Sequence, residues 1–170
     1  PLCDAAGVPL IVNDDALVCK LSGAAGVHIG LGDGSIRAAG KLLGSDKIIG
    51  ATAHNLDEAL AAQAAGADYI GVGAAFGSKS KGNAVRLANL KAYKDITSAV
   101  DIPVIAIGGI NAGNVGELAG LGLSGIAVIS AIFGSRDIAA SAHELRAAAQ
   151  ALTSPPCAED NSEEGTETDG

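Results

Sequence analysis

Short hydrophobic runs alternate along the chain with segments in which hydrophobic residues recur at helical spacing. The runs are rich in Val and Ile, which is typical of parallel strands buried beneath helices. In the segment 55–66, Leu56, Ala59 and Leu60 share one face and Asn55 is placed to cap the N-terminus. The alternation predicts an α/β fold. The predicted strands are 9–13, 26–29, 47–52, 68–73, 103–107 and 125–130, and the other predicted helices are 88–100, 114–120 and 136–152.

The number of predicted strands decides between two α/β architectures. A closed (β/α)8 TIM barrel needs eight strands, and residues 1–7 have the pattern of a helix end. We therefore expect a TIM barrel that lacks its first two βα units, with six strands visible. An open doubly wound sheet is the alternative, but it needs a glycine-rich loop after its first strand, where this chain has Asn13-Asp14-Asp15. The chain contains no methionine, from which we expect it to be a fragment.

The composition of the chain predicts an acidic C-terminal tail and argues against nucleic-acid and membrane partners. The chain has 170 residues and a net charge of −8, and six of its acidic residues lie within 159–170. We expect one domain over 1–152 and a disordered acidic tail over 153–170. The sequence has no basic patch of the kind that binds nucleic acid. It also has no run that approaches the ~18 apolar residues of a membrane span. The three cysteines have no metal or redox spacing, and we expect Cys3 and Cys19 in the core. These features favour small-molecule partners and an intracellular location, in the cytoplasm or a plastid.

Two late strands end in small residues that suit a phosphate. Ala106-Ile-Gly-Gly-Ile-Asn111 closes one run, and Gly125-Ile-Ala-Val-Ile-Ser-Ala131 closes the next. Glycine lets backbone N–H groups approach a ligand, and N–H groups that open a helix favour an anion. The loops after the last two strands of (β/α)8 barrels commonly hold a phosphate. We expect a phosphate site at these loops; the alternative is that Gly108-Gly109 only makes a tight turn.

Two carboxylates follow neighbouring strands. Asp14 ends the first strand, and Asp33 lies just beyond the second. Mg²⁺ is typically held by one or two carboxylates together with substrate phosphates. The pattern favours a shared cation site, with helix capping by each aspartate as the alternative.

Other polar residues at strand ends leave their roles open. Ser78, Ser80 and Lys81 form a cluster of hydroxyls and an ammonium that suits phosphate oxygens, or else a solvated loop. His28 and His54 end the second and third strands. Each is either an acid–base group or a structural histidine.

The chain resembles the thiamine-phosphate synthase family over about residues 1–150. The resemblance is carried, in this order, by Pro-Leu-Ile-Val-Asn-Asp at 9–14, Gly-Val-His-Ile-Gly at 26–30, Gly-Ala-Asp-Tyr-Ile-Gly at 66–71, Ala-Ile-Gly-Gly-Ile at 106–110 and Val-Ile-Ser-Ala-Ile at 128–132. It implies a TIM barrel and a Mg²⁺-dependent alkyl transfer. Hydroxymethylpyrimidine diphosphate loses pyrophosphate, and the nitrogen of thiazole phosphate attacks the resulting cation to give thiamine phosphate.

The resemblance also implies roles for individual residues. Asp14 and Asp33 resemble the Mg²⁺ ligands. The residues that resemble the pyrimidine-diphosphate contacts are Asn13, Thr52 and Lys81. Those that resemble the thiazole-phosphate contacts are Ser78, Ser80, Gly109, Ile129 and Ser130. No residue is implied as a general acid or base.

Some features depart from the family pattern. A Gln-x-Arg-x-Lys segment at an earlier strand end is absent, and Leu31-Gly32 replaces the usual Gln-Glu before Asp33. We expect this fragment alone to be inactive. A thiazole tautomerase-like barrel with His54 as its base is one alternative, and a non-catalytic phosphate-binding remnant is another.

Overall fold

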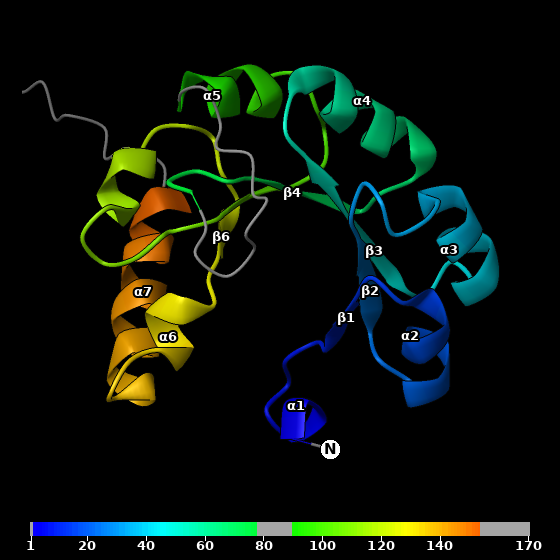
Figure 1. Ribbon diagram of the computed structural model, residues 1–170, viewed down its shortest axis with the longest axis horizontal. Coiled ribbons are helices and arrows are strands. Elements are labelled where there is room, and N and C mark those ends of the chain that lie inside the picture. The colour runs from blue at the N-terminus through cyan, green and yellow to red at the C-terminus, as the bar shows by residue number, and fades with distance from the viewer. Residues whose placement is uncertain (1, 78–89, 154–170) are drawn as a thin grey trace, which may run out of the picture.

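Six parallel strands form one sheet in the order in which they occur along the chain. The computed structural model describes residues 2–77 and 90–153 (Figure 1). Each predicted strand is confirmed within three residues at either end. The strands are β1 (Ile11–Asn13), β2 (Gly26–Ile29), β3 (Ile48–Ala53), β4 (Tyr69–Gly73), β5 (Val104–Ile107) and β6 (Gly125–Ala127).

Most of the helices cover the outer side of the sheet in sequence order, and the result is an α/β half-barrel (Figure 1). Neighbouring helices touch from α2 to α5, and α7 packs on β6. The strands β1 and β6 are the two edges of the sheet. The helices are α1 (Leu2–Ala5), α2 (Ala16–Ser22), α3 (Ile36–Leu43), α4 (Leu56–Ala65), α5 (Lys91–Thr97), α6 (Ser130–Phe133) and α7 (Ile138–Thr153).

Three predicted helices differ from the observed elements. The helix predicted over 114–120 is a short 3₁₀ helix, η1 (Val115–Leu118), because Gly116 and Gly120 are poor helix formers and Asn114 bonds the preceding backbone. The helix predicted over 88–100 is α5, seven residues long, and residues 88 and 89 lie outside the described ranges. The last helix begins at Ile138, since Asp137 Oδ1 accepts the Ala140 N–H at 2.9 Å.

The core lies between the sheet and its helices and is almost entirely aliphatic. The larger cluster joins β3, β4 and β5 to α4, α5 and η1, and the smaller one joins β2 and β3 to α2 and α3. Tyr93 is fully buried, and its hydroxyl donates to Val72 O at 2.7 Å. Cys19 is in the smaller cluster as predicted, whereas Cys3 is only half-buried on α1, so that prediction was wrong.

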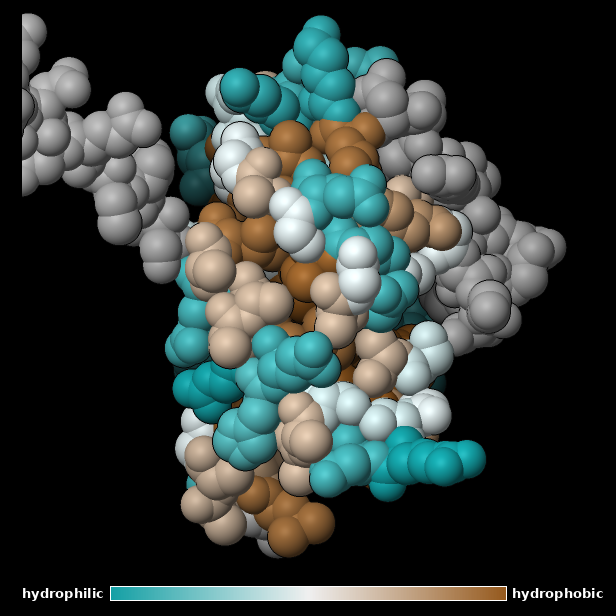
Figure 2. All heavy atoms as spheres, turned by 90° about the vertical axis from the view of Figure 1, so that its left-hand side faces the viewer, coloured by the Kyte–Doolittle hydropathy of each residue, from teal (hydrophilic) through white to brown (hydrophobic). Residues whose placement is uncertain are grey.

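The surface around α6 and α7 carries hydrophobic side chains between hydrophilic ones (Figure 2). Phe133 and Ile138, beside the turn that joins these helices, are 72% and 49% exposed. Within the two described ranges, no helix combines the length and hydrophobicity that a membrane span requires. The acidic tail predicted over 153–170 lies, apart from Thr153, outside the described residues.

Candidate active site

A cavity of about 750 Å³ opens at the carboxyl ends of the strands. It is walled by the segments that follow β2 to β6, because parallel strands bring their carboxyl ends to one edge of the sheet. Five of the predicted site residues line it: Asp33, Thr52, Gly109, Ile129 and Ser130. The structure therefore brings Asp33, one of the two predicted cation ligands, and the predicted phosphate loops to one cavity, whereas Asp14 is not among the residues that line it.

The Asp14 and Asp33 carboxylates both lie over Gly30. A Cβ built on Gly30 would overlap Asp33 Oδ2 and lie 3.8 Å from Asp14 Oδ1. Gly30 lines the cavity directly after β2. The space that a side chain at position 30 would fill is thus taken by the Asp33 carboxylate, and the Asp14 carboxylate lies at van der Waals distance from it. No role for Gly30 was predicted from the sequence. The signal that could have found it is a glycine directly after the second strand, between Asp14 and Asp33 in the chain.

Neither aspartate caps a helix, which rules out the alternative left open by the sequence. The N-cap of α2 is Asp15, whose Oδ1 accepts the N–H groups of Leu17 and Val18 at 2.9 Å each. The N-cap of α3 is Ser35. Asp14 adopts a left-handed conformation with φ 70°, and its N–H donates to His28 O at 2.8 Å. Because of this turn in the backbone, the side chains of Asp14 and Asp15 point in different directions.

Two carboxylates suit a hard cation that takes its other ligands from water and phosphate. Among the described residues, no group of three or more His, Cys, Asp or Glu side chains is placed to hold a metal. A closed protein-only site of the kind that holds structural zinc is therefore not formed there. The donor set fits Mg²⁺, which usually keeps several waters and binds substrate phosphates.

The opposite wall of the cavity depends on two glycines after β5. Gly108 and Gly109 have φ of 99° and 69°. A Cβ on Gly108 would lie 2.6 Å from Ala74 Cβ, and one on Gly109 would overlap the carbonyl oxygen of Gly77. The close approach of the loops after β4 and β5 thus requires glycine at both positions. The pair does make a tight turn, and that turn forms part of the cavity wall.

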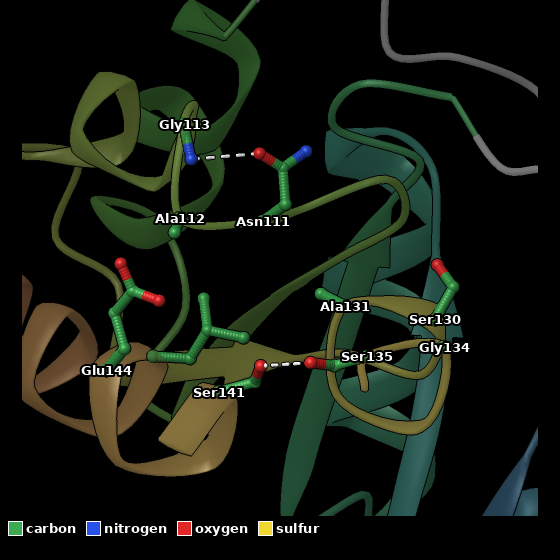
Figure 3. Close-up of a pocket in the computed structure, with 10 residues that line it drawn as sticks. Asn111, Ala112, Gly113, Ser130, Ala131, Gly134, Ser135, Ser141 and Glu144 are labelled. Carbon is green, nitrogen blue, oxygen red and sulfur yellow. Dashed lines mark hydrogen bonds between the residues drawn. The ribbon is translucent and has the colours of Figure 1, made fainter. Parts of the chain in front are cut away.

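The loop after Gly109 is braced by asparagines rather than by a long helix. Asn114 Oδ1 accepts the Asn111 N–H at 2.8 Å, and Asn114 Nδ2 donates to Gly109 O at 3.0 Å. Asn111 Oδ1 accepts the Gly113 N–H at 2.9 Å (Figure 3). These bonds fix the loop and direct the Gly109 carbonyl towards Asn114.

The segment after β6 forms another part of the cavity wall. Ile129 and Ser130 line it, and Ser130 begins the four-residue helix α6. The first N–H groups of a helix have no acceptor within that helix. A smaller hollow of about 310 Å³ behind α6 lies between this segment and α7, and there Ser141 Oγ donates to Ser135 Oγ at 2.7 Å (Figure 3).

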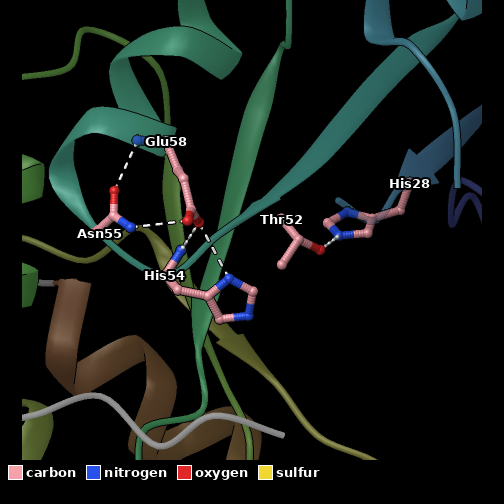
Figure 4. Close-up of polar contacts among 5 residues, drawn as sticks. All are labelled: His28, Thr52, His54, Asn55 and Glu58. Carbon is pink, nitrogen blue, oxygen red and sulfur yellow. Dashed lines mark hydrogen bonds and ion pairs between the residues drawn. The ribbon is translucent and has the colours of Figure 1, made fainter. Parts of the chain in front are cut away.

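Thr52 is held by a histidine inside the sheet. His28 Nε2 lies 2.9 Å from Thr52 Oγ1 (Figure 4). His28 Nδ1 lies 3.0 Å from the Tyr69 hydroxyl. Both ring nitrogens of His28 thus bond protein groups, which is the structural role left open for this histidine. Tyr69 was given no role from the sequence, although it lies in the motif at 66–71, because its contact with His28 joins residues 41 positions apart.

His54 lines the cavity and is held by Glu58 at the start of α4. Glu58 Oε2 accepts the His54 N–H at 2.7 Å and lies 3.1 Å from His54 Nδ1 (Figure 4). Asn55 caps the helix, since its Oδ1 accepts the Glu58 N–H at 2.9 Å. Partial desolvation raises the pKa of Glu58, but the hydrogen bonds from His54 and Asn55 outweigh it, and the net shift is downward from the usual value.

The remaining predicted site residues are placed as follows. Asn13 is exposed at the end of β1 and does not line the cavity. Ser78, Ser80 and Lys81 lie outside the described residues. Leu31 lines the cavity beside Asp33 with 59% of its surface exposed, so an apolar side chain faces solvent at the cation side.

Comparison with protein families shows what this chain is similar to. The family described as thiamine monophosphate synthase matches residues 1–132. The thiamine-phosphate synthase of Clostridium tetani is 42% identical over 144 residues, which cover 85% of this chain and 68% of that protein. The enzyme of the same name from Chloroflexus aurantiacus is 45% identical, over 84% of this chain and 65% of that protein. The chain thus spans about two thirds of the length of these relatives.

A solved structure agrees with the sequence comparison. The thiamine phosphate pyrophosphorylase from Pyrococcus furiosus superposes with a TM-score of 0.81 at 36% sequence identity. The match covers 90% of this chain and 73% of that one. The half-barrel described above therefore corresponds to most of a known structure of that enzyme.

Proposed function

Because the chain belongs to the thiamine monophosphate synthase family, we propose that the complete protein carrying it makes thiamine phosphate. The reaction joins hydroxymethylpyrimidine diphosphate to thiazole phosphate. The bond between the pyrimidinylmethyl carbon and the diphosphate oxygen breaks, and pyrophosphate leaves with the electron pair. The thiazole nitrogen then forms the new bond to that carbon. The single observation that carries the proposal is that the carboxylates of Asp14 and Asp33 both lie beside Gly30, which lines the cavity together with Asp33, Gly109 and Ser130.

The cation side of the cavity suits the diphosphate. Asp14 and Asp33 supply hard oxygen ligands, and neither carboxylate caps a helix. When bound there, Mg²⁺ neutralises charge on the diphosphate oxygens and so favours departure of pyrophosphate. Thr52 lines the same cavity and offers a hydroxyl to those oxygens. In this proposal Asn13 and Lys81 assist at the diphosphate.

The glycine side of the cavity suits the phosphate of the second substrate. The Gly109 turn and the start of α6 at Ser130 both line the cavity, and their backbone N–H groups would be the donors to an anion. We place the thiazole phosphate there, with Ile129, Ser78 and Ser80 as its further contacts. The two anionic groups then lie at opposite sides of one cavity, which aligns the thiazole nitrogen with the carbon it attacks.

The sheet also supports a proposal about the whole fold. Its strands follow one another in order, as in a (β/α)8 barrel, and β1 and β6 are its edges. Hydrophobic side chains near both edges are exposed, with Leu10 48% and Ile129 62% exposed. We propose that two further βα units close the barrel between β6 and β1, that the chain is a fragment of that barrel, and that it is inactive without them. Small-molecule substrates and an intracellular location, cytoplasmic or plastid, belong to the same proposal.

A tautomerase-like reaction is the second candidate, because one observation favours it. Glu58 holds His54 Nδ1 and leaves Nε2 of this cavity-lining ring available for proton transfer. That reaction releases no pyrophosphate, however, and gives the Asp14 and Asp33 pair no task. The paired carboxylates therefore favour the synthase.

The test is product formation by the complete protein. It is incubated with hydroxymethylpyrimidine diphosphate, thiazole phosphate and Mg²⁺, and thiamine phosphate is measured by mass spectrometry. We expect product, and no product from this 170-residue chain alone. Absence of product from the complete protein overturns the synthase. Isomerisation of a thiazole carboxylate phosphate in its place establishes the tautomerase, and phosphate binding without either reaction leaves a phosphate-binding remnant.

A further inference from the structure

Two asparagine side chains hold one carbonyl group of the turn after β5. Asn114 Nδ2 donates to Gly109 O at 3.0 Å, and Asn111 Nδ2 donates to the same oxygen at 3.2 Å. The oxygen of each amide accepts a backbone N–H, since Asn114 Oδ1 bonds Asn111 N at 2.8 Å and Asn111 Oδ1 bonds Gly113 N at 2.9 Å (Figure 3). Because a backbone carbonyl only accepts and an N–H only donates, these contacts fix the orientation of both amides.

The direction of the Gly109 carbonyl sets the direction of the next N–H group. In a trans peptide, the C=O of one residue and the N–H of the next point in opposite directions, and the peptide bond between Gly109 and Ile110 is trans. The Ile110 N–H is therefore directed away from the two asparagine amides. The preceding peptide is held as well, because Gly108 O accepts the Phe76 N–H at 3.0 Å and the Gly109 N–H then points away from the loop after β4.

Within the ranges 2–77 and 90–153, neither the Gly109 N–H nor the Ile110 N–H has an acceptor. Both residues line the cavity of about 750 Å³, and Ile110 is only 4% exposed. Buried backbone N–H groups nearly always have a partner. Successive N–H groups of a turn form a concave site that suits an anion. The two donors in this cavity wall therefore fit the oxygens of a phosphate.

The asparagines supply an order that a glycine turn lacks by itself. Glycine is conformationally permissive, so the peptide after Gly109 can turn over unless side chains hold it. A carbonyl turned towards an anion would repel it and would withdraw the Ile110 N–H, because both groups share one peptide plane. We infer that Asn114, together with Asn111, is a positioning residue that keeps this carbonyl turned away and so presents the N–H groups of the turn to a phosphate. That this phosphate belongs to the thiazole substrate rests on the proposed function, whereas the orientation of the turn does not.

The first arm of the test follows the amide protons of the turn by NMR in the complete protein. Inorganic phosphate is added together with a chelator, so that no divalent cation binds the phosphate. We expect the Gly109 and Ile110 amide protons to move downfield in the native protein, and the Ile110 response to be lost in Asn114→Ala. An Ile110 signal that does not respond to phosphate in the native protein overturns the inference.

The same spectra separate positioning from direct contact. Asn114 itself lines the cavity, and its amide could bond the phosphate without any effect on the turn. In that case the Ile110 amide proton would still move downfield in Asn114→Ala, only at higher phosphate concentration. A full Ile110 response at saturating phosphate in Asn114→Ala therefore overturns the inference.

The second arm uses calorimetry to compare thiazole phosphate with the same thiazole lacking its phosphate. Asn114→Ala should raise the Kd of the phosphate about tenfold, as for a lost bond to a charged group, and that of the unphosphorylated thiazole less than about twofold. Asp137→Ala removes another side-chain bond to a backbone N–H, at the start of α7. Gly116→Ala adds a Cβ that meets nothing within 4 Å in η1. Both controls should leave the Kd of thiazole phosphate unchanged.

The outcomes distinguish this inference from the proposed function. Equal weakening of both thiazoles in Asn114→Ala indicates a purely structural role and overturns the inference. If the native protein binds inorganic phosphate but not thiazole phosphate, the proposed function fails, and the response of Ile110 still decides the inference. Because neither arm requires turnover, a failed synthase assay is a separate result.

Discussion

Asp14 and Asp15 are neighbours in the chain with different tasks. Asp15 Oδ1 accepts two N–H groups at the start of α2, at 2.9 Å each, while the Asp14 carboxylate lies over Gly30 beside that of Asp33. The left-handed backbone of Asp14, with φ 70°, separates the two directions. Asp and Asn adopt this conformation more readily than most residues. The sequence pair thus combines a structural cap with a candidate metal ligand.

This division predicts opposite effects for two adjacent substitutions. Asp14→Asn keeps the backbone preference and removes the charge, so turnover of the complete enzyme should fall at least about 100-fold with little change in stability. Asp15→Ala removes the cap, so the free energy of unfolding should fall by about 1 kcal/mol while turnover persists. Initial rates and urea unfolding of both variants provide the measurement. Equal turnover losses in the two variants would remove Asp14 from the metal site.

Gly30 should be intolerant of even one methyl group. A Cβ at this position would overlap Asp33 Oδ2, whereas a Cβ on Gly32 meets nothing within 4 Å. Gly30→Ala should therefore displace the Asp33 carboxylate and weaken Mg²⁺ affinity by about 10- to 100-fold. Gly32→Ala is the matched control and should bind as the native protein does. Mg²⁺ titrations that do not distinguish Gly30→Ala from Gly32→Ala would contradict the shared site.

Ser130 should matter less through its side chain than through its backbone. The proposal assigns the thiazole phosphate to N–H groups, which Ser130→Ala keeps. We expect KM for thiazole phosphate to rise less than about fivefold, compared with at least about 100-fold loss of turnover in Asp14→Asn. Steady-state kinetics of the two variants make the comparison. A loss in Ser130→Ala as large as that in Asp14→Asn would assign the hydroxyl a larger role.

The Glu58 carboxylate should stabilise the fold only while it is charged. Its pKa is lowered in the folded protein, so its contribution is present above the ordinary value near 4.5 and is lost as pH falls through the lowered folded value. Glu58→Gln should therefore be less stable than the native protein at pH 7 but approach it as pH falls below about 4. The difference should be small, because the His54 and Glu58 side chains are 32% and 31% exposed. Asp57→Asn removes a carboxylate from the same helical turn as a control, and a gap that widens on acidification would refute the assignment.

The sequence predicted what depends on local pattern. The Val- and Ile-rich runs located all six strands, because buried parallel strands are hydrophobic on both faces. Asn55 was identified as the cap of α4, since it stands directly before the first residue of the helical pattern. The segment 114–120 was assigned the wrong helix type, because its glycines and the Asn111 and Asn114 side-chain bonds compete with an α-helix.

Contacts between residues that are far apart in the sequence could not be predicted from local patterns. Spacing does not distinguish Asp14 from Asp15, or Asp33 from Ser35, as the residue that caps a helix. The link from Tyr69 through His28 to Thr52 spans 41 and 24 residues. It depends on strand register and on a glycine at position 50, which no single segment reveals.

The measurement that tests the central claim most directly is the Mg²⁺ dependence of thiamine phosphate formation. It compares the complete enzyme with Asp33→Asn, and with Ser35→Ala as the control that alters only the cap of α3. If Asp14 and Asp33 hold the cation that assists pyrophosphate release, a chelator abolishes product in the native enzyme, Asp33→Asn requires far more Mg²⁺ or is inactive, and Ser35→Ala behaves as native. Product that persists with chelator, or an Mg²⁺ requirement that is identical in Asp33→Asn and the native enzyme, would contradict the account.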